Sequence, residues 1–338
     1  MFGQKSTRQI DLHLPTGWNR CTTEELEAIA AAIIQEQQRV DRYHPFDWSR
    51  VKLNVVLSIN SIQPPSNPPR GKMESLPTGR FGGGRTWFVK RPQDEEPWPI
   101  TVGQLVALTE RLAWIDDEKA SKVIFQFPYP ELELVQGSGF RVQGSKRKTH
   151  SPKPLTINRE PLTVAGPPPL LDGYTWQEYR WLTDWMQAYM RHSNAKNAEG
   201  AAQAQREFLA ILFKPAADAT GTGAKGEKMF HVQCSMFNDF DPVKWQVILF
   251  WWSSLMSMLA KKFPKVFKSQ PVGKGKRRPQ QQQDTPWDFY NRVTATIQKY
   301  IGGLSEQDVN NATYGTILQQ LEMMADEAAE MEKLKRKK

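Results

Sequence analysis

The strongest hydrophobic pattern lies in residues Val243–Phe267, the most apolar window of an otherwise polar chain. Apolar side chains recur there every three or four residues, as on one face of an α-helix. The stripe consists of Val243, Val247, Phe250, Trp251, Leu255, Met258, Leu259 and Phe263. It is widened almost to the full circumference by Ile248, Leu249, Trp252 and Met256. We therefore expect a buried helix that Pro264 ends or kinks. The uninterrupted apolar run, about eight residues, is far short of the roughly 18 to 20 that a membrane span needs, so no membrane association is expected.

The N-terminal part has the pattern of a small helical subdomain. Residues Gln9–Leu14 alternate enough to form a short strand. Thr22 and Glu25 have the spacing of a capping box, which predicts a helix from this point to about Asp41. The apolar run Trp48–Ile59 fits a helix or a buried strand, because its periodicity does not distinguish the two.

The middle of the chain is rich in proline and glycine. Prolines lack a backbone donor and glycines are costly to order, so residues Gln63–Pro99 are predicted to form a loop or extended arm. The amphipathic pattern of Thr101–Asp117 predicts a helix. Between Lys122 and Pro169, short pieces such as VIFQF and ELELV are interspersed with a basic cluster and a run of prolines, which predicts irregular, β-flavoured structure.

The second half is more regular. Residues Tyr174–His192 and Glu199–Phe213 carry aromatic and aliphatic side chains at helical spacing. Neither segment can bury its stripe alone, so they are expected to form a bundle with Val243–Phe267. Residues Ser269–Asp284 have no apolar periodicity and combine Gly, Pro, basic residues and a Gln run, which predicts a solvated linker.

A helical hairpin is predicted after this linker. Thr285 caps a first helix that Gly302 and Gly303 stop, and Ser305 opens one long second helix. Along the second helix, acidic residues at 326, 327, 330 and 332 precede basic residues at 333 and 335–338, an order that the helix dipole favours.

The predicted fold class is mainly α: a helical bundle with a small N-terminal subdomain, an irregular Pro/Gly-rich middle region and a tethered C-terminal helical hairpin. The predicted domains are an N-terminal helical subdomain (1–62), a Pro/Gly-rich loop or arm (63–99), a helix with an irregular β-flavoured region (100–169), an aromatic-rich helical core (170–268), a basic and Gln-rich linker (269–284) and the C-terminal hairpin (285–338).

Composition narrows the class of protein. The 338 residues include 12 Trp, 16 Phe and 8 Tyr, which argues against disorder throughout. The chain has two cysteines, Cys21 and Cys234, which are far apart in the sequence. Neither a disulfide framework nor a structural zinc site is therefore expected. The start has no apolar run typical of a secretory signal. We expect a cytoplasmic protein.

The sequence offers no catalytic constellation. The histidines, each in a different segment, are His13, His44, His150, His192 and His231. The carboxylate pairs Asp116–Asp117 and Asp239–Asp241 are of a kind that commonly ends or caps surface helices. Residues Gly221–Lys228 lack the Gly-Lys-Ser/Thr ending and the preceding strand of a phosphate-binding loop. We therefore expect no enzymatic activity, no cofactor and no bound metal.

Basic residues in the Pro/Gly-rich segments are candidates for nucleic-acid contact. They are Arg80, Arg85, Lys146, Arg147, Lys148, Lys274, Lys276, Arg277 and Arg278. Such residues beside aromatic rings can neutralise phosphates and flank stacked bases. The clusters are short and separated, however, and the formal net charge of +9 is moderate, so solvated loops are the favoured interpretation.

The C-terminal helix carries a candidate partner-binding face. Its residues are Ile317, Leu321, Met324, Ala328 and Met331. Methionine side chains adapt to varied apolar surfaces, so this face could accept helices of different sequence. The alternative is that the face packs on its own neighbouring helix or on the bundle. Self-association to a homo-oligomer is also left open.

Several segments resemble proteins encoded in tail gene clusters of Bacteroidetes phages and prophages. They are LPTGWNRCTTEELEAIA, LLDGYTWQEYRWLTDWMQAYMRH, EFLAILF and the FWW helix that ends in KKFPKVF. In this setting the chain is similar to a tail assembly chaperone, a class that coats the helical tape-measure protein and delivers tail-tube subunits. The resemblance covers roughly the first 60 residues and the part after residue 170.

The resemblance implies a non-enzymatic tail assembly protein of the host cytoplasm, with tape-measure and tail-tube proteins as partners and no cofactor. The C-terminal hairpin would be its client-binding arm. Two alternatives remain: a structural subunit of a tail, neck or baseplate, and a basic nucleic-acid-binding protein whose affinity falls with salt.

Overall fold

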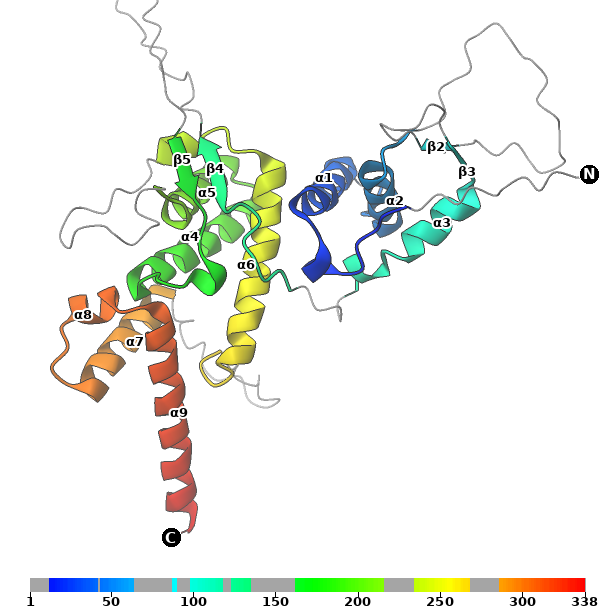
Figure 1. Ribbon diagram of the computed structural model, residues 1–338. Helices are drawn as coiled ribbons and strands as arrows, with labels where there is room; N and C mark the ends of the chain where they lie inside the picture. The colour runs from blue at the N-terminus through cyan, green and yellow to red at the C-terminus, as the bar shows by residue number, and fades with distance from the viewer. Residues whose placement is uncertain are drawn as a thin grey trace, which may run out of the picture. The chain divides into compact units, whose positions relative to one another are not determined.

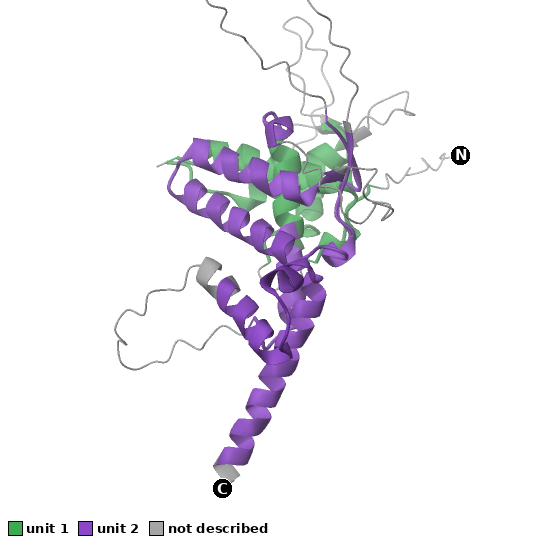
Figure 2. Cartoon of the chain, turned by 90° about the vertical axis from the view of Figure 1, so that its left-hand side faces the viewer, with its two compact units in different colours: residues 1–124, 241–251 green, residues 125–240, 252–338 purple. Residues whose placement is uncertain are grey.

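A computed structural model shows that the chain is mainly α-helical, which confirms the predicted fold class (Figure 1). The structure describes residues 12–41, 43–63, 87–89, 98–117, 123–134, 162–215, 234–267 and 286–337. The chain divides into two compact units (Figure 2). Unit 1 comprises residues 1–124 and 241–251, and unit 2 comprises residues 125–240 and 252–338.

Helices α1 (Thr23–Arg39), α2 (Trp48–Ile59) and α3 (Val102–Glu110) form most of unit 1, where α1 packs on α2 and α2 packs on α3. The predicted capping box is present, because the backbone N–H of Glu25 donates to Thr22 Oγ1 at 3.2 Å and that of Thr22 donates to Glu25 Oε2 at 2.8 Å. The run Trp48–Ile59, which the sequence left open, is a helix.

Two expectations for this part of the chain differ from the structure. Residues 12–14, the described end of the predicted first strand, are not in a strand. The predicted helix Thr101–Asp117 ends at Glu110 and is followed by the 3-10 turn η2 (Ala113–Ile115). The change of geometry tightens the backbone so that Leu112 and Ile115 are both buried.

A small antiparallel sheet lies in the region predicted as a loop or arm. Its order is β1 (Ile62–Gln63), β2 (Trp87–Val89), β3 (Trp98–Ile100). Pro99 is opposite Phe88 and is tolerated because β3 is an edge strand that needs no donor on its outer side. Strands of two or three residues are too short to show an alternating pattern, which explains why the sequence did not predict them.

An aromatic cluster in unit 1 is centred on Trp18, in the 3-10 turn η1 (Trp18–Arg20). The ring of Trp18 is edge-on to Trp114 at 5.3 Å and to Phe250 at 5.2 Å. The indole N–H of Trp114 donates to the carbonyl of Pro15 at 3.2 Å. These contacts hold together three segments that are far apart in the sequence.

Helix α6 (Pro242–Lys262) is the buried helix that the sequence predicts, and it ends just before Pro264. Its residues up to Trp251 belong to unit 1 and those from Trp252 onward belong to unit 2. Its buried apolar side chains are Trp245, Val247, Ile248, Trp251, Trp252, Leu255 and Leu259, and Phe263 directly after the helix is also buried. Among the described residues, no helix has the length and apolarity to cross a bilayer.

Helices α4 (Trp176–Asn194) and α5 (Ala198–Leu212) are joined by a short turn and pack against each other in unit 2. Both agree closely with the predicted helices. Phe208 of α5 meets Trp252 edge-on at 5.2 Å. The 3-10 turn η5 (Cys234–Phe237) lies against α5, and the 3-10 turn η3 (Pro169–Leu171) precedes α4.

A second antiparallel sheet has the order β4 (Glu131–Leu134), β5 (Leu162–Ala165), β6 (Lys214–Pro215). Strand β4 corresponds to the ELELV piece, and its burial alternates as the sequence pattern requires. The described residues of the VIFQF piece form no strand.

The C-terminal helices are α7 (Pro286–Ile301), α8 (Glu306–Asn311) and α9 (Tyr314–Lys337), and all three contact α4 within unit 2. Gly302 and Gly303 end α7 with φ values of 71° and 73°, as predicted. The single long helix predicted from Ser305 is wrong, because the chain leaves helical geometry at Ala312 and Thr313. Those residues pair with the backbone before α4 instead.

The core of unit 2 gives a direct test of these assignments. Leu182 of α4 is fully buried, whereas Gln187 of the same helix is exposed. We expect Leu182→Ala to lower the free energy of unfolding by about 2 to 5 kcal/mol, because it leaves a cavity in a packed interior. Gln187→Ala should change it by no more than roughly 0.5 kcal/mol. Urea unfolding followed by circular dichroism measures both, and equal effects would contradict the assigned orientation of α4.

Candidate functional site

Three of the titratable residues weighed as catalytic candidates make contacts within the protein. Asp116 pairs with Lys52 at 2.7 Å, and Asp241 accepts a hydrogen bond from the backbone of Val243 at the start of α6. His44 contacts Asp41 at 3.0 Å on an exposed turn. In the described parts of the chain, no cluster of three or more His, Cys, Asp or Glu could hold a metal ion. His150, His231 and residues 221–228 lie outside the described residues.

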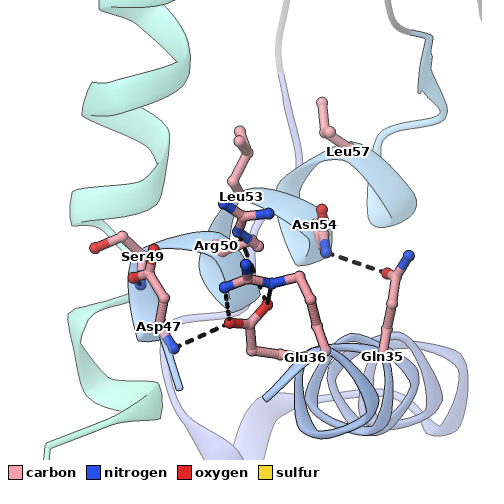
Figure 3. A pocket seen from close by; sticks show the side chains of 9 residues that line it. Gln35, Glu36, Asp47, Ser49, Arg50, Leu53, Asn54 and Leu57 are labelled. Carbon is pink, nitrogen blue, oxygen red and sulfur yellow. Dashed lines mark hydrogen bonds and ion pairs between the residues drawn. The ribbon is translucent and has the colours of Figure 1, made fainter. Parts of the chain in front are cut away.

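A hollow of about 480 Å³ lies between α1 and α2 of unit 1 (Figure 3). It is lined by Gln35, Glu36, Arg39, Asp47, Ser49, Arg50, Leu53, Asn54 and Leu57. Figure 3 shows the carboxylate of Glu36 reaching from α1 toward the start of α2. Asn54 and Gln35 form a second link between the two helices, at 3.2 Å.

The carboxylate of Glu36 is 1% exposed and is surrounded by donors. Arg39 binds it in a bidentate manner at 2.6 and 3.0 Å, and the backbone N–H of Asp47 donates to it at 3.1 Å. Arg50 is farther away, at 3.8 Å. Asp47 is also the N-cap of α2, so Glu36 connects the last turn of α1 to the cap of α2.

The hydrogen bond from Arg39 lowers the pKa of Glu36 below its ordinary value of 4.5, and the Asp47 backbone and the charge of Arg50 act in the same direction. The group is therefore ionised and fully engaged with protein donors. A carboxylate in this state is poorly suited to proton transfer at neutral pH. We conclude that the hollow surrounds a structural link between two helices.

This link has a pH signature. Because the folded-state pKa of Glu36 is lowered, the stability it contributes is present above the unfolded value of 4.5 and is lost as the pH falls through the lower folded value. We expect Glu36→Gln to lower the thermal unfolding midpoint at pH 7, with a difference from wild type that shrinks in acid. Glu24→Gln, at an exposed position of the same helix, is the control. A difference for Glu36→Gln that stays constant from pH 7 to acid would contradict the assigned role.

The five residues predicted to bind a partner lie along α9 but in different environments. Ile317 is only 3% exposed and belongs to the core of unit 2. Leu321 and Met324 are half-buried, whereas Ala328 and Met331 are exposed. Ile317, Leu321 and Met324 therefore pack within unit 2, which was one of the two alternatives. No described residue buries Ala328 or Met331.

The first turn of α9 is held by backbone and side-chain contacts. The backbone of Thr313 pairs with that of Thr175, and Tyr314 N–H donates to the carbonyl of Tyr174 at 3.0 Å. The ring of Tyr314 stacks on Tyr179 of α4 at 4.9 Å. Farther along, Glu322 accepts a hydrogen bond from the backbone N–H of Lys265 at 3.1 Å.

Beyond these contacts, α9 presents large apolar side chains to solvent. Met323, Met331 and Leu334 are 47%, 57% and 59% exposed. The sequence prediction did not include Leu334, although it lies three residues after Met331 and thus on the adjoining side of the helix. Figures 1 and 2 both show the C-terminal end of α9 extending away from the other elements of unit 2. We call residues 328–335 the exposed end of α9.

The nine basic residues weighed as nucleic-acid contacts all lie outside the described residues. Comparison with known protein families, with curated proteins and with solved structures finds no match to this chain.

Proposed function

We propose that the chain is a non-enzymatic assembly protein that binds helical segments of other proteins through the exposed end of α9. Its clients would be the tape-measure and tail-tube proteins of a phage tail, as the resemblance to tail assembly chaperones implies. The observation that carries the proposal is the exposure of Met331 and Leu334 on a helix whose first turn is fixed to α4.

An apolar helix face can bind another amphipathic helix without any change in its own backbone. The exposed end of α9 already has helical geometry, so little ordering cost opposes binding. Methionine and leucine side chains, together with the small Ala328, allow several helix sequences to pack there. These properties suit a chaperone that must cover different stretches of one long helical client.

The proposal is tested by co-expressing the chain with a candidate tape-measure protein and measuring co-purification. The double variant Met331→Gln with Leu334→Gln removes the two exposed apolar side chains without changing net charge. We expect client capture to fall by at least roughly tenfold, because each apolar side chain buried at an interface contributes about 1.5 to 3 kcal/mol.

The matched control is Glu330→Gln with Lys333→Gln, which alters two other exposed residues of the same helix and also preserves net charge. This control should capture the client as wild type does. Absence of co-purification with the wild-type chain, or equal capture by the two double variants, would contradict the proposal.

A further inference from the structure

We propose that the exposed end of α9 pairs antiparallel with the same segment of a second copy of this chain. This inference goes beyond the binding of tail clients and does not depend on it, because it concerns two copies of one chain only. Three features of α9 support it: the spacing of its apolar residues, the order of its charges and the exposure of Ala328 and Met331 at the end of its apolar line.

The apolar residues have the spacing of a two-stranded coiled coil. Leu321, Met324, Ala328 and Met331 follow one another at intervals of three, four and three residues. In an antiparallel pair, each of these residues lies opposite a different residue of the other copy. Met331 of each copy therefore faces Ala328 of the other. Large side chains then meet small ones, which fills space evenly. A parallel pair would put Ala328 against Ala328 and leave a gap.

The charges favour the same orientation. Asp326, Glu327, Glu330 and Glu332 precede Lys333 and Lys335, and Arg336 and Lys337 follow in the sequence. The antiparallel layers that match Met331 with Ala328 also place Lys335 of one copy opposite Met324 and near Glu327 of the other. Opposite charges therefore approach each other, whereas a parallel pair would put Lys335 beside Lys335.

The contacts of α9 within unit 2, with Lys265 and with Tyr300 of α7, leave the last part of this seam exposed. Glu322 and Asp326 both contact Lys265, which occupies one side of the helix. With 3.6 residues per turn, that side lies opposite the line through Ala328 and Met331. Both of these residues are exposed. Ala328 and Met331 are thus exposed on this line, whereas Leu321 and Met324, earlier on it, are half-buried within unit 2.

The length of the seam sets the strength of the pair. From Met324 to Lys335 the helix extends over about 18 Å, or roughly three turns. An interface of this length falls below the roughly 1,200 Å² typical of stable complexes. We therefore expect a dimer that forms and dissociates with concentration.

The first experiment is sedimentation equilibrium of the full chain over a roughly hundredfold range of concentration. We expect the mass to rise from one copy to two. Ala328→Glu places a carboxylate opposite Met331 and should keep the chain at one copy. Ala329→Glu makes the same change one residue later, at an exposed position off the seam, and should dimerise as wild type does. One-copy mass for wild type throughout, or dimerisation of Ala328→Glu at wild-type strength, would overturn the proposal.

A second experiment determines whether the two α9 helices of the pair are antiparallel or parallel. Chains carrying Ala328→Cys are mixed with chains carrying Met331→Cys under mild oxidation. An antiparallel pair gives mainly the mixed disulfide, and a majority of disulfides between identical chains would overturn the antiparallel geometry. Background from the native thiols should be low, because burial raises the pKa of Cys21 to about 12 and that of Cys234 to about 11. The unmodified chain serves as the control.

The two proposals can fail separately. A chain that stays monomeric yet captures the tape-measure protein would remove the self-pairing and leave the assembly role. A chain that dimerises but captures no client would do the reverse.

Discussion

The pairing of two short backbone segments determines how unit 2 is arranged. Residues 174–176 lie antiparallel to residues 312–314, where Trp176 N–H donates to the carbonyl of Ala312 at 2.7 Å and Tyr314 N–H donates to that of Tyr174 at 3.0 Å. Each segment directly precedes a helix, α4 in one case and α9 in the other. The bridge therefore fixes the starts of two long helices beside each other and satisfies backbone groups that helix termini leave open.

Helix α4 then connects the remaining C-terminal elements. Arg180 is 4% exposed and donates to Asn291 of α7 at 3.1 Å and to Asn310 of α8 at 3.3 Å. Trp176 donates from its indole nitrogen to Thr294 of α7 at 3.4 Å. The C-terminal segment, predicted as a hairpin on a tether, is thus bound to α4 along its length up to the first turns of α9. Among the described residues of this segment, the most exposed apolar side chains are Met331 and Leu334 in the exposed end of α9.

Sequence patterns predicted the helices well because their signals are local. The caps predicted at Thr22 and Ser305 each depend on residues within four positions of the chain, and both are present. The break at Ala312 and Thr313 had no such signal, because its cause is Thr175, far away in the sequence. For the same reason, the sequence predicted an apolar stripe along α9 but not the residue after which that stripe is no longer buried. That limit depends on α4, which buries Ile317 and leaves Met331 exposed.

The contacts of α9 with Lys265 respond to salt differently from the contacts at the first turn of α9. Lys265 and Asp326 form an ion pair in which both side chains are about half exposed, so dissolved ions screen it, whereas the backbone bridge at Thr313 is insensitive to them. Rising ionic strength should therefore weaken the contact of α9 with Lys265 before it weakens the contacts at the first turn of α9. Salt concentration should therefore affect how firmly α9 is held along its length, while its attachment beside α4 stays the same.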